Sequence, residues 1–352
     1  MISTKDKWSI EQGYSKYQYD CIISSFSINN LIEKYTKPIF HYTSFENCLN
    51  ILKFQKGNKK EVFLELYATH FSFLNDIEEF WNGFSIMIRE LKTIHKTNEL
   101  NNNVKKIIKK FLKDIEDIQP PHYIISFNTG GNNLSQWKYY GKNCGVAIEF
   151  DTCDCKYFLN GPNYMSHDAY RVIYDDKKKN NEIKQILEVI KAMALDANAN
   201  VRQEITYSIL RAFASVSFMK NKHYKHEDEV RLLFAPFYDE TDSSPSLLLQ
   251  QELMKNKVFY RKKEEYIAPY LKIKVKHKDD KPEKRMYPVK SLTVGPGQNQ
   301  KLIYNALIMF VQTNFPVENP KIREHKDNDG DDCESISVNG IKVRRSLIPF
   351  RG

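Results

Sequence analysis

The chain has 352 residues, and its 53 Lys and Arg against 44 Asp and Glu give a formal net charge of +9 at pH 7. With 41% hydrophobic residues and only 13 Gly and 13 Pro, it is neither collagen-like, linker-rich nor of low complexity. The basic surplus favours an anionic partner such as a nucleic acid, a nucleotide or an acidic surface. A Lys-rich solvated surface explains it as well, because the lysines are scattered along the chain.

The sequence favours a reduced, cytoplasmic protein without a membrane segment. Its start, MISTKDKWSIEQGY, lacks the apolar stretch of a signal peptide. The longest apolar runs, such as Tyr123–Phe127 and Ala306–Val311, are too short to span a bilayer. The six cysteines show no spacing typical of a disulfide framework, as expected in a reducing compartment.

In the first third of the chain, breakers and apolar spacing predict two extended segments and two helical ones. A strand is expected at Ile39–Tyr42, and Ser44 can cap a helix over residues 45–54. A second extended stretch covers Val62–Phe73. Residues 77–118 are predicted to be helical, with apolar residues on one face and lysines on the other.

The middle of the chain alternates short apolar runs with turn-forming residues. Strands are expected at His122–Phe127, Cys144–Phe150 and Tyr170–Tyr174. Between the first two, residues 128–133 form a Gly/Asn-rich loop, and a short helical turn follows at 135–140.

The last part of the chain begins with two helices over residues 181–220, judged from apolar residues three and four apart. Strand-like segments then follow at Glu229–Phe234, 257–277, Met286–Val294 and Ile341–Ile348.

Strands dispersed between helices without regular βαβ alternation predict an α+β fold. Neither a repeat nor a dividing linker is visible, so one elaborated domain over residues 1–352 is expected. Its expected parts are an N-terminal extension (1–35), a core (36–318) with helical insertions at about 77–118 and 181–220, an acidic exposed loop (319–336) and a closing strand (337–352).

Familiar catalytic and metal motifs are absent from the sequence. There is no G-x-G-x-x-G, no Walker A and no H-E-x-x-H. Cys153 and Cys155, with Cys144 upstream, are a weak zinc pattern because no second ligand pair lies nearby. The acidic run Asp327–Asp332 has glycine at its fourth position rather than the sixth that a calcium loop needs. We therefore expect no metal.

Four stretches combine apolar strands with polar or aromatic residues at their ends. Each has an ordinary structural explanation: a lone strand-end histidine, core aromatics on a helical turn, or three charges, Glu227, Glu229 and Arg231, on one solvated strand face. The stretches are His41–Ser44, Phe71–Glu79, the set Ile125–Phe127, Ser135–Tyr140 and Gly145–Phe150, and His226–Arg231.

Taken in order, the elements HYTS, FLNDxxE, SxWxxY with GVAIEFD, ExExR, LTVGP and SLIPFR resemble the bacterial family called domain of unknown function 2971. The resemblance covers roughly residues 36–351. That family is in turn similar to a divergent branch of the ADP-ribosyltransferase superfamily. The resemblance therefore implies a split β-sheet core with helical insertions.

The superfamily resemblance implies an NAD-binding triplet of His41, a hydroxyl or aromatic residue from Ser126, Ser135 or Tyr140, and Glu229. NAD would be a substrate, cleaved at its nicotinamide–ribose bond through an oxocarbenium-like transition state. Glu229 would bind the ribose 2′-hydroxyl and stabilise the developing cation.

The same resemblance gives the neighbouring residues expected roles. Glu227 would orient or deprotonate the acceptor, and Arg231 would pair with a glutamate or meet the pyrophosphate. His41 would hold the adenosine-side ribose, with the backbone beside it at Tyr42 and Thr43 meeting the nicotinamide amide. Nicotinamide would stack on the aromatic pair Trp137 and Tyr140.

Two departures from the pattern limit this assignment. Many relatives have glycine after the histidine, where this chain has Tyr42. Asn75, Asp76 and Glu79 match the nearer family but receive no role, and a strand-to-helix turn explains them equally well.

The expected function is ADP-ribosyl transfer to a macromolecular acceptor, a nucleic acid or a protein, or else NAD hydrolysis. The resemblance adds an expectation of a role in anti-phage defence or toxicity. The alternative is a non-catalytic nucleic-acid-binding module, in which aromatic and basic residues supply stacking and phosphate contacts. A phosphodiesterase or nuclease lacks a convincing metal-ligand cluster.

Overall fold

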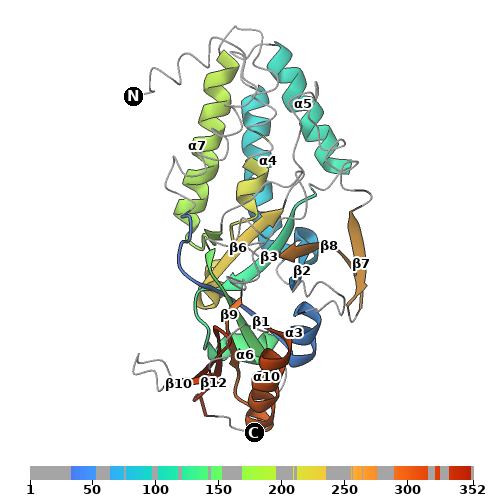
Figure 1. Ribbon diagram of the computed structural model, residues 1–352. Helices are drawn as coiled ribbons and strands as arrows, with labels where there is room; N and C mark the ends of the chain where they lie inside the picture. Colours follow the sequence, from blue (N-terminus) through green and yellow to red (C-terminus); the bar gives the residue numbers. More distant parts are fainter. Residues whose placement is uncertain are drawn as a thin grey trace, which may run out of the picture.

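The computed structural model (Figure 1) describes most of the chain from residue 33 onward. The described residues are 33–52, 64–74, 77–96, 102–117, 121–141, 144–152, 169–195, 209, 212–234, 255, 257–263, 265–275, 289–315, 322–325 and 333–349.

The helices and strands follow one another in a mixed order, which confirms the predicted α+β class. The strands are β1 (Ile39–Thr43), β2 (Leu64–His70), β3 (Tyr123–Asn128), β4 (Val146–Phe150), β5 (Tyr170–Arg171), β6 (Glu229–Phe234), β7 (Val258–Lys262), β8 (Ile267–Val275), β9 (Val289–Val294), β10 (Ile322–His325), β11 (Cys333–Val338) and β12 (Ile341–Ser346). The helices are α3 (Phe45–Ile51), α4 (Ile77–Lys96), α5 (Asn102–Asp117), α6 (Leu134–Tyr140), α7 (Asp176–Leu195) and α10 (Gln300–Asn314), with 3₁₀ helices η1 (Phe71–Phe73) and η3 (Lys222–Glu227).

All the strands of the described residues belong to one sheet, whose main path runs β10-β11-β12-β9-β4-β1-β3-β2-β8-β7. The β9–β12 pair is parallel, and the other pairs are antiparallel. Strand β6 pairs with the whole of β3, and the short β5 pairs with β6.

The sheet branches at β3. One edge of β3 pairs with β6, whereas its other edge is shared by β2 at Tyr123 and Ile124 and by β1 at Asn128. Residues 125–127 of β3 therefore lie at a gap between the ends of two neighbouring strands. This gap positions the candidate site described below.

Apolar cores lie on both faces of the sheet around β3. Ile125 and Phe127 join the larger core with buried residues of α3 and α10. Ile124, on the opposite face, joins a second core made with α4, α5, α7 and residues 209–219. Figure 1 shows α4, α5 and α7 standing together at one end of the molecule and α10 beside β12 at the other.

Helix α5 shows why the sequence forms a helix here. Its buried residues Val104, Ile108, Phe111 and Ile115 are spaced four, three and four apart and face the second core. Its lysines fall between them, on the other face, which is the pattern of an amphipathic surface helix. Among the described residues, no helix is both long and apolar enough to cross a bilayer.

The structure departs from the sequence-based expectation near the C-terminus. Strand β10 and the beginning of β11 lie within residues 319–336, where an exposed loop was expected, and they pair with each other. The pairing reaches from Ile322 opposite Val338 to His325 opposite Ser335. Helix α10 had no predicted counterpart.

Candidate functional site

A cluster of four charged side chains lies on β6 and the segment before it. Glu229 and Arg231 occupy alternate positions of β6, so they share one sheet face, opposite Asn128 and Ser126 of β3. Lys220 and Glu227 reach the same point from the preceding segment. The side chains of Lys220, Glu229 and Arg231 are at most 7% exposed, and that of Glu227 is 13% exposed.

The cluster is held by short charge-assisted hydrogen bonds. Arg231 binds Glu229 with two nitrogens, Nε to Oε1 at 2.7 Å and Nη2 to Oε2 at 3.0 Å. Lys220 Nζ lies 2.6 Å from Glu227 Oε2 and 3.3 Å from Glu229 Oε2. Arg231 Nη1 donates to the Ser217 carbonyl oxygen at 2.7 Å. Two cations and two anions thus neutralise one another in a buried place, the condition that makes buried charges tolerable.

The surroundings of Glu229 keep it ionised. Burial by itself would raise its pKa, but Arg231 and Lys220 outweigh burial and lower the pKa to about 2. A hydrogen bond from the Ser126 side chain acts in the same direction. A permanent negative charge therefore lies beside the branch of the sheet at neutral pH.

A turn held by hydrogen bonds places Glu229 at the start of β6. The preceding residue, Asp228, has a left-handed backbone with φ of 43°, a conformation that aspartate tolerates better than most residues. Its carboxylate accepts from Arg171 Nη1 at 2.7 Å and from the Thr129 hydroxyl. The Glu229 N–H donates to Tyr174 Oη at 2.9 Å. These bonds fix the turn from both sides.

Glu227 does not occupy the strand face on which the sequence pattern placed it. It is the last residue of η3, and the left-handed Asp228 separates it from β6. The expected alternation of three charges on one strand therefore holds only for Glu229 and Arg231. Glu227 nevertheless approaches Glu229 through their common partner Lys220.

His41 lies on β1, beside the gap that the ends of β1 and β2 leave along the edge of β3. On β1 it is paired with Ile148 of β4, and its ring packs edge-on against Phe127 of β3 at 5.8 Å between centroids. His41 Nδ1 is 3.2 Å from the Ser126 carbonyl oxygen. His41 thus meets the backbone of the same residue whose side chain bonds to Glu229, and the two predicted ligands are connected through Ser126.

The environment of His41 favours a neutral ring. Burial lowers its pKa, and the charge of Arg261 adds to this effect, while the bond to Ser126 opposes it. Because a carbonyl oxygen only accepts, the Nδ1 of this neutral ring carries the hydrogen, and Nε2 is left as an acceptor. A neutral His41 is therefore chemically suited to receive a hydroxyl hydrogen.

The predicted aromatic residues form a separate packed group around α6. Trp137 is 5% exposed and packs edge-on against Tyr42, with ring centroids 4.6 Å apart. Tyr42 Oη donates to the Gly130 carbonyl at 2.7 Å and accepts from the Asn133 N–H at 2.8 Å. In this conformation Trp137 and Tyr42 act as structural residues that hold the Gly/Asn-rich loop.

The motif LTVGP is also explained by packing around Trp137. A Cβ added at Gly295 would lie 2.5 Å from Trp137 Cε3, so only glycine allows this approach. Gln300 Nε2 donates to the carbonyl oxygens of Gly295 and Ser346, at 3.0 and 2.9 Å. The LTVGP and SLIPFR segments, both part of the sequence resemblance, are therefore joined through Gln300.

Other predicted site residues lie near this group. Thr43 is buried at the end of β1, and Tyr140 of α6 is 38% exposed. Ser135 donates its N–H to the capping residue Asn133 at 2.9 Å. Helix α6 lies beside β1 and also beside η3, which carries Glu227.

Some sequence patterns fall outside what the structure describes. Asn75 and Asp76, and Cys153 and Cys155 of the weak zinc pattern, lie outside the described residues. Glu79 lies in the first turn of α4, at a position for which the structure describes the backbone alone. Within the described part of the chain, no group of three or more His, Cys, Asp or Glu side chains is arranged to hold a metal ion.

Sequence reasoning missed three residues that complete the cluster. Lys220 is the last residue of a predicted helical segment and belongs to no motif, Ser217 contributes its carbonyl oxygen, and Tyr174 ends a predicted strand. The only available signal was indirect: a buried pair of glutamates requires more positive charge than Arg231 alone supplies.

Comparison with known proteins shows a family match over part of the chain. Residues 136–232 match the family described as "Protein of unknown function (DUF2971)". The match spans α6 to most of β6 and includes all four charged residues of the cluster. It supports the resemblance to this family. No curated protein and no solved structure matches the chain.

Proposed function

We propose that the protein is an NAD-consuming enzyme of the ADP-ribosyltransferase type, with Glu229 as its catalytic carboxylate. The observation that carries the proposal is the buried, ionised Glu229 beside the branch of the sheet, joined through Ser126 to a neutral His41. The branched pairing at β3 is compatible with the split sheet that the resemblance implies.

The chemistry needs a negative charge close to the ribose. The bond between ribose C1′ and nicotinamide N1 breaks, nicotinamide leaves with the bonding electron pair, and positive charge develops on the ribose. A hydroxyl or amino group of the acceptor, or water, then bonds to C1′ and loses its proton. A fixed carboxylate stabilises the developing charge because it needs no reorganisation during the reaction. Glu229 has that fixed charge.

The bond lengths indicate which oxygen of Glu229 can receive a ribose hydroxyl. Oε1 accepts Arg231 Nε at 2.7 Å, and Oε2 accepts Arg231 Nη2 at 3.0 Å. Lys220 approaches Oε2 at only 3.3 Å and lies closer to Glu227, at 2.6 Å, so Lys220 is the partner that a substrate can displace. A substrate hydroxyl that takes the place of Lys220 at Oε2 leaves Lys220 paired with Glu227. We therefore assign ribose binding to Oε2.

The remaining residues of the site receive roles from their chemistry. The Nε2 acceptor of His41 suits the hydroxyl of the second ribose. Lys220, which keeps its bond to Glu227, would turn the donor released from Glu229 toward the pyrophosphate, since Arg231 stays bound to Glu229 and Ser217. Glu227, the more exposed glutamate, is positioned to take the proton of the acceptor. Tyr140, which is partly exposed, replaces the buried Trp137 as the candidate for contact with nicotinamide.

The experiment follows transfer from NAD labelled in its adenylate half, with RNA, DNA, cell protein or no additive. We expect labelled acceptor or free ADP-ribose from the natural chain and at least about a 100-fold slower reaction from Glu229→Gln. Glu149→Gln is the matched control. Like Glu229, Glu149 is a largely buried glutamate, with its side chain 13% exposed, and it accepts a hydrogen bond from the Ser291 hydroxyl, but it lies on β4. Equal rates for Glu229→Gln and the natural chain, or no product under any condition, would overturn the proposal.

A further inference from the structure

One face of the β7–β8 hairpin carries aromatic rings interleaved with cations. Phe259 and Arg261 of β7 lie on the same face as Tyr270 and Lys272 of β8, because Phe259 pairs with Tyr270. Tyr67 of β2 continues this face, since it pairs with Lys272. We call these five residues the aromatic face. Val258, Leu271 and Leu66, on the other face, pack into the larger core.

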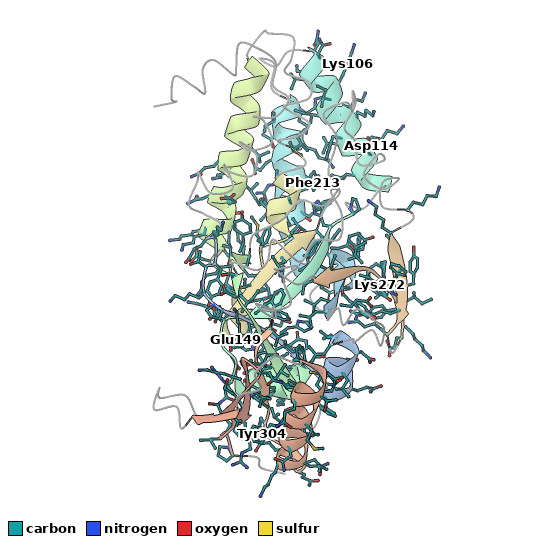
Figure 2. The ribbon with its side chains drawn as sticks, viewed as in Figure 1. Lys106, Asp114, Glu149, Phe213, Lys272 and Tyr304 are labelled. Carbon is teal, nitrogen blue, oxygen red and sulfur yellow. The ribbon has the colours of Figure 1, made fainter. Side chains whose placement is uncertain are left out.

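The rings form a row across three strands. The centroids of Phe259 and Tyr270 are 5.9 Å apart, and those of Tyr270 and Tyr67 are 4.4 Å apart. Lys272 Nζ lies 4.3 Å from the Phe259 centroid, and the Arg261 guanidinium carbon lies 5.6 Å from both tyrosine centroids. Phe259 is 43% exposed at the outer end of the row, which ends at the edge strand β7. Figure 2 labels Lys272 in this part of the molecule.

The hairpin also concentrates positive charge. Residues 255–272 contain six Lys or Arg and two Glu, a net charge of +4, whereas the whole chain of 352 residues carries +9. Arg261 has a further unused donor, because its buried Nε has no hydrogen-bond partner among the described residues. Burial lowers the pKa of Arg261, so its charge is costly to keep without an anion nearby.

We propose that the aromatic face binds single-stranded nucleic acid. The exposed ring of Phe259 can stack with an unpaired base, with the buried Tyr270 and the half-buried Tyr67 packed beside it, and adjacent Lys and Arg neutralise phosphates. A duplex keeps its bases stacked inside and cannot use the rings, and a surface for an apolar protein partner would lack the cations. The face therefore fits an unpaired strand of RNA or DNA.

The aromatic face adjoins the candidate catalytic site. Arg261 Nη2 donates to Thr69 Oγ1 at 2.8 Å, Thr69 pairs with Ile124 of β3, and Ser126 lies two residues further along the same face. Arg261 is also among the charges that lower the pKa of His41. The bound strand would then be the acceptor of ADP-ribose, a step that rests on the function proposed above, whereas binding itself does not.

The test measures fluorescence anisotropy of a labelled 20-nucleotide RNA, a DNA of the same sequence and its duplex, using the full chain without NAD. We expect either single strand, or both, to bind more tightly than the duplex. Phe259→Ala should weaken single-strand binding about tenfold, and Phe259→Tyr, which keeps a stacking ring, should restore it. Lys272→Gln should reduce the slope of log K against log salt concentration by about 0.7.

Matched controls come from the other face of the same strand. Tyr260 is 70% exposed and Lys262 is exposed, and both alternate with the residues of the aromatic face. Tyr260→Ala and Lys262→Gln should bind like the natural chain. Absence of single-strand binding, tighter binding of the duplex, or equal effects on the two faces would overturn the proposal.

A further variant, at Glu229, separates this proposal from the proposed function. Glu229→Gln should bind the single strand as the natural chain does, because Glu229 is not part of the aromatic face. Binding that persists while no variant or natural chain consumes NAD would support the aromatic face and refute only the enzymatic proposal. NAD consumption without single-strand binding would support the enzymatic proposal and refute only the role of the aromatic face.

Discussion

Replacing Glu229 with Gln should destabilise the protein, and the loss should depend on pH in a defined direction. In the natural chain Glu229 binds Arg231 through two nitrogens and also meets Lys220, with all three side chains at most 7% exposed. The substitution leaves two buried cations facing Glu227 alone. Removing one partner from a buried ionic cluster costs about 3–5 kcal/mol, and we expect about 3 because the Gln oxygen keeps part of the hydrogen bonding.

The shifted pKa gives a second value for the free energy by which ionised Glu229 stabilises the natural chain. Folding lowers the pKa of Glu229 from 4.5 to about 2. A carboxylate with a lowered folded-state pKa stabilises the fold above its unfolded pKa, and this contribution is lost as the pH falls toward the folded value. Linkage over this window gives a loss of about 2 kcal/mol by pH 3 and about 3 kcal/mol by pH 2.

Urea unfolding of both proteins at pH 7 and at pH 3 measures the two effects together. The unfolding free energy of the natural chain should exceed that of Glu229→Gln by about 3 kcal/mol at pH 7. The difference should shrink by about 2 kcal/mol at pH 3, because there the unfolded chain binds a proton at Glu229, whereas the folded chain, with its pKa of about 2, keeps the residue mostly ionised. Equal stability at pH 7, or a difference that stays constant with pH, would refute the buried ionised cluster.

Two further predictions concern the packing around α6. Tyr42→Phe removes the hydroxyl that bonds the backbone of Gly130 and Asn133, and it should lower the unfolding free energy by about 1–3 kcal/mol and speed amide hydrogen exchange in that loop; unchanged exchange would contradict the assigned bonds. Gly295→Ala forces a methyl group against Trp137 and should cost about 1–3 kcal/mol with a changed tryptophan emission; a variant with natural stability and emission would show that the close approach is not there.

The sequence predicts local structure well where apolar spacing is regular. Helix α5 follows from buried residues that repeat at the helical period, and strand β3 follows from a short continuous apolar run of strand length. Helix α10 escaped prediction because residues 306–311 are apolar throughout, so they reveal no preferred face. Strand β10 and the start of β11 lie in a segment that was interpreted as an acidic, turn-rich loop. They pair with each other, and neither segment's sequence indicates that pairing.

The candidate site could be predicted only in part, because its connections depend on the tertiary fold. The E-x-E-x-R pattern pointed to Glu229 and Arg231, and their shared face follows from strand alternation. Lys220 could not be found, since its role depends on where the chain folds back onto β6. The expected strand position of Glu227 was wrong because the left-handed Asp228 interrupts the alternation.

Release of nicotinamide from NAD at pH 7 tests the central claim most directly. The natural chain should release nicotinamide, alone or when an RNA or DNA single strand is added, and Glu149→Gln should match it. Glu229→Gln should be at least about 100-fold slower, since its charge is missing when the ribose becomes positive. Nicotinamide release that is unchanged in Glu229→Gln, or no release by the natural chain under either condition, would contradict the assignment of Glu229 as the catalytic carboxylate.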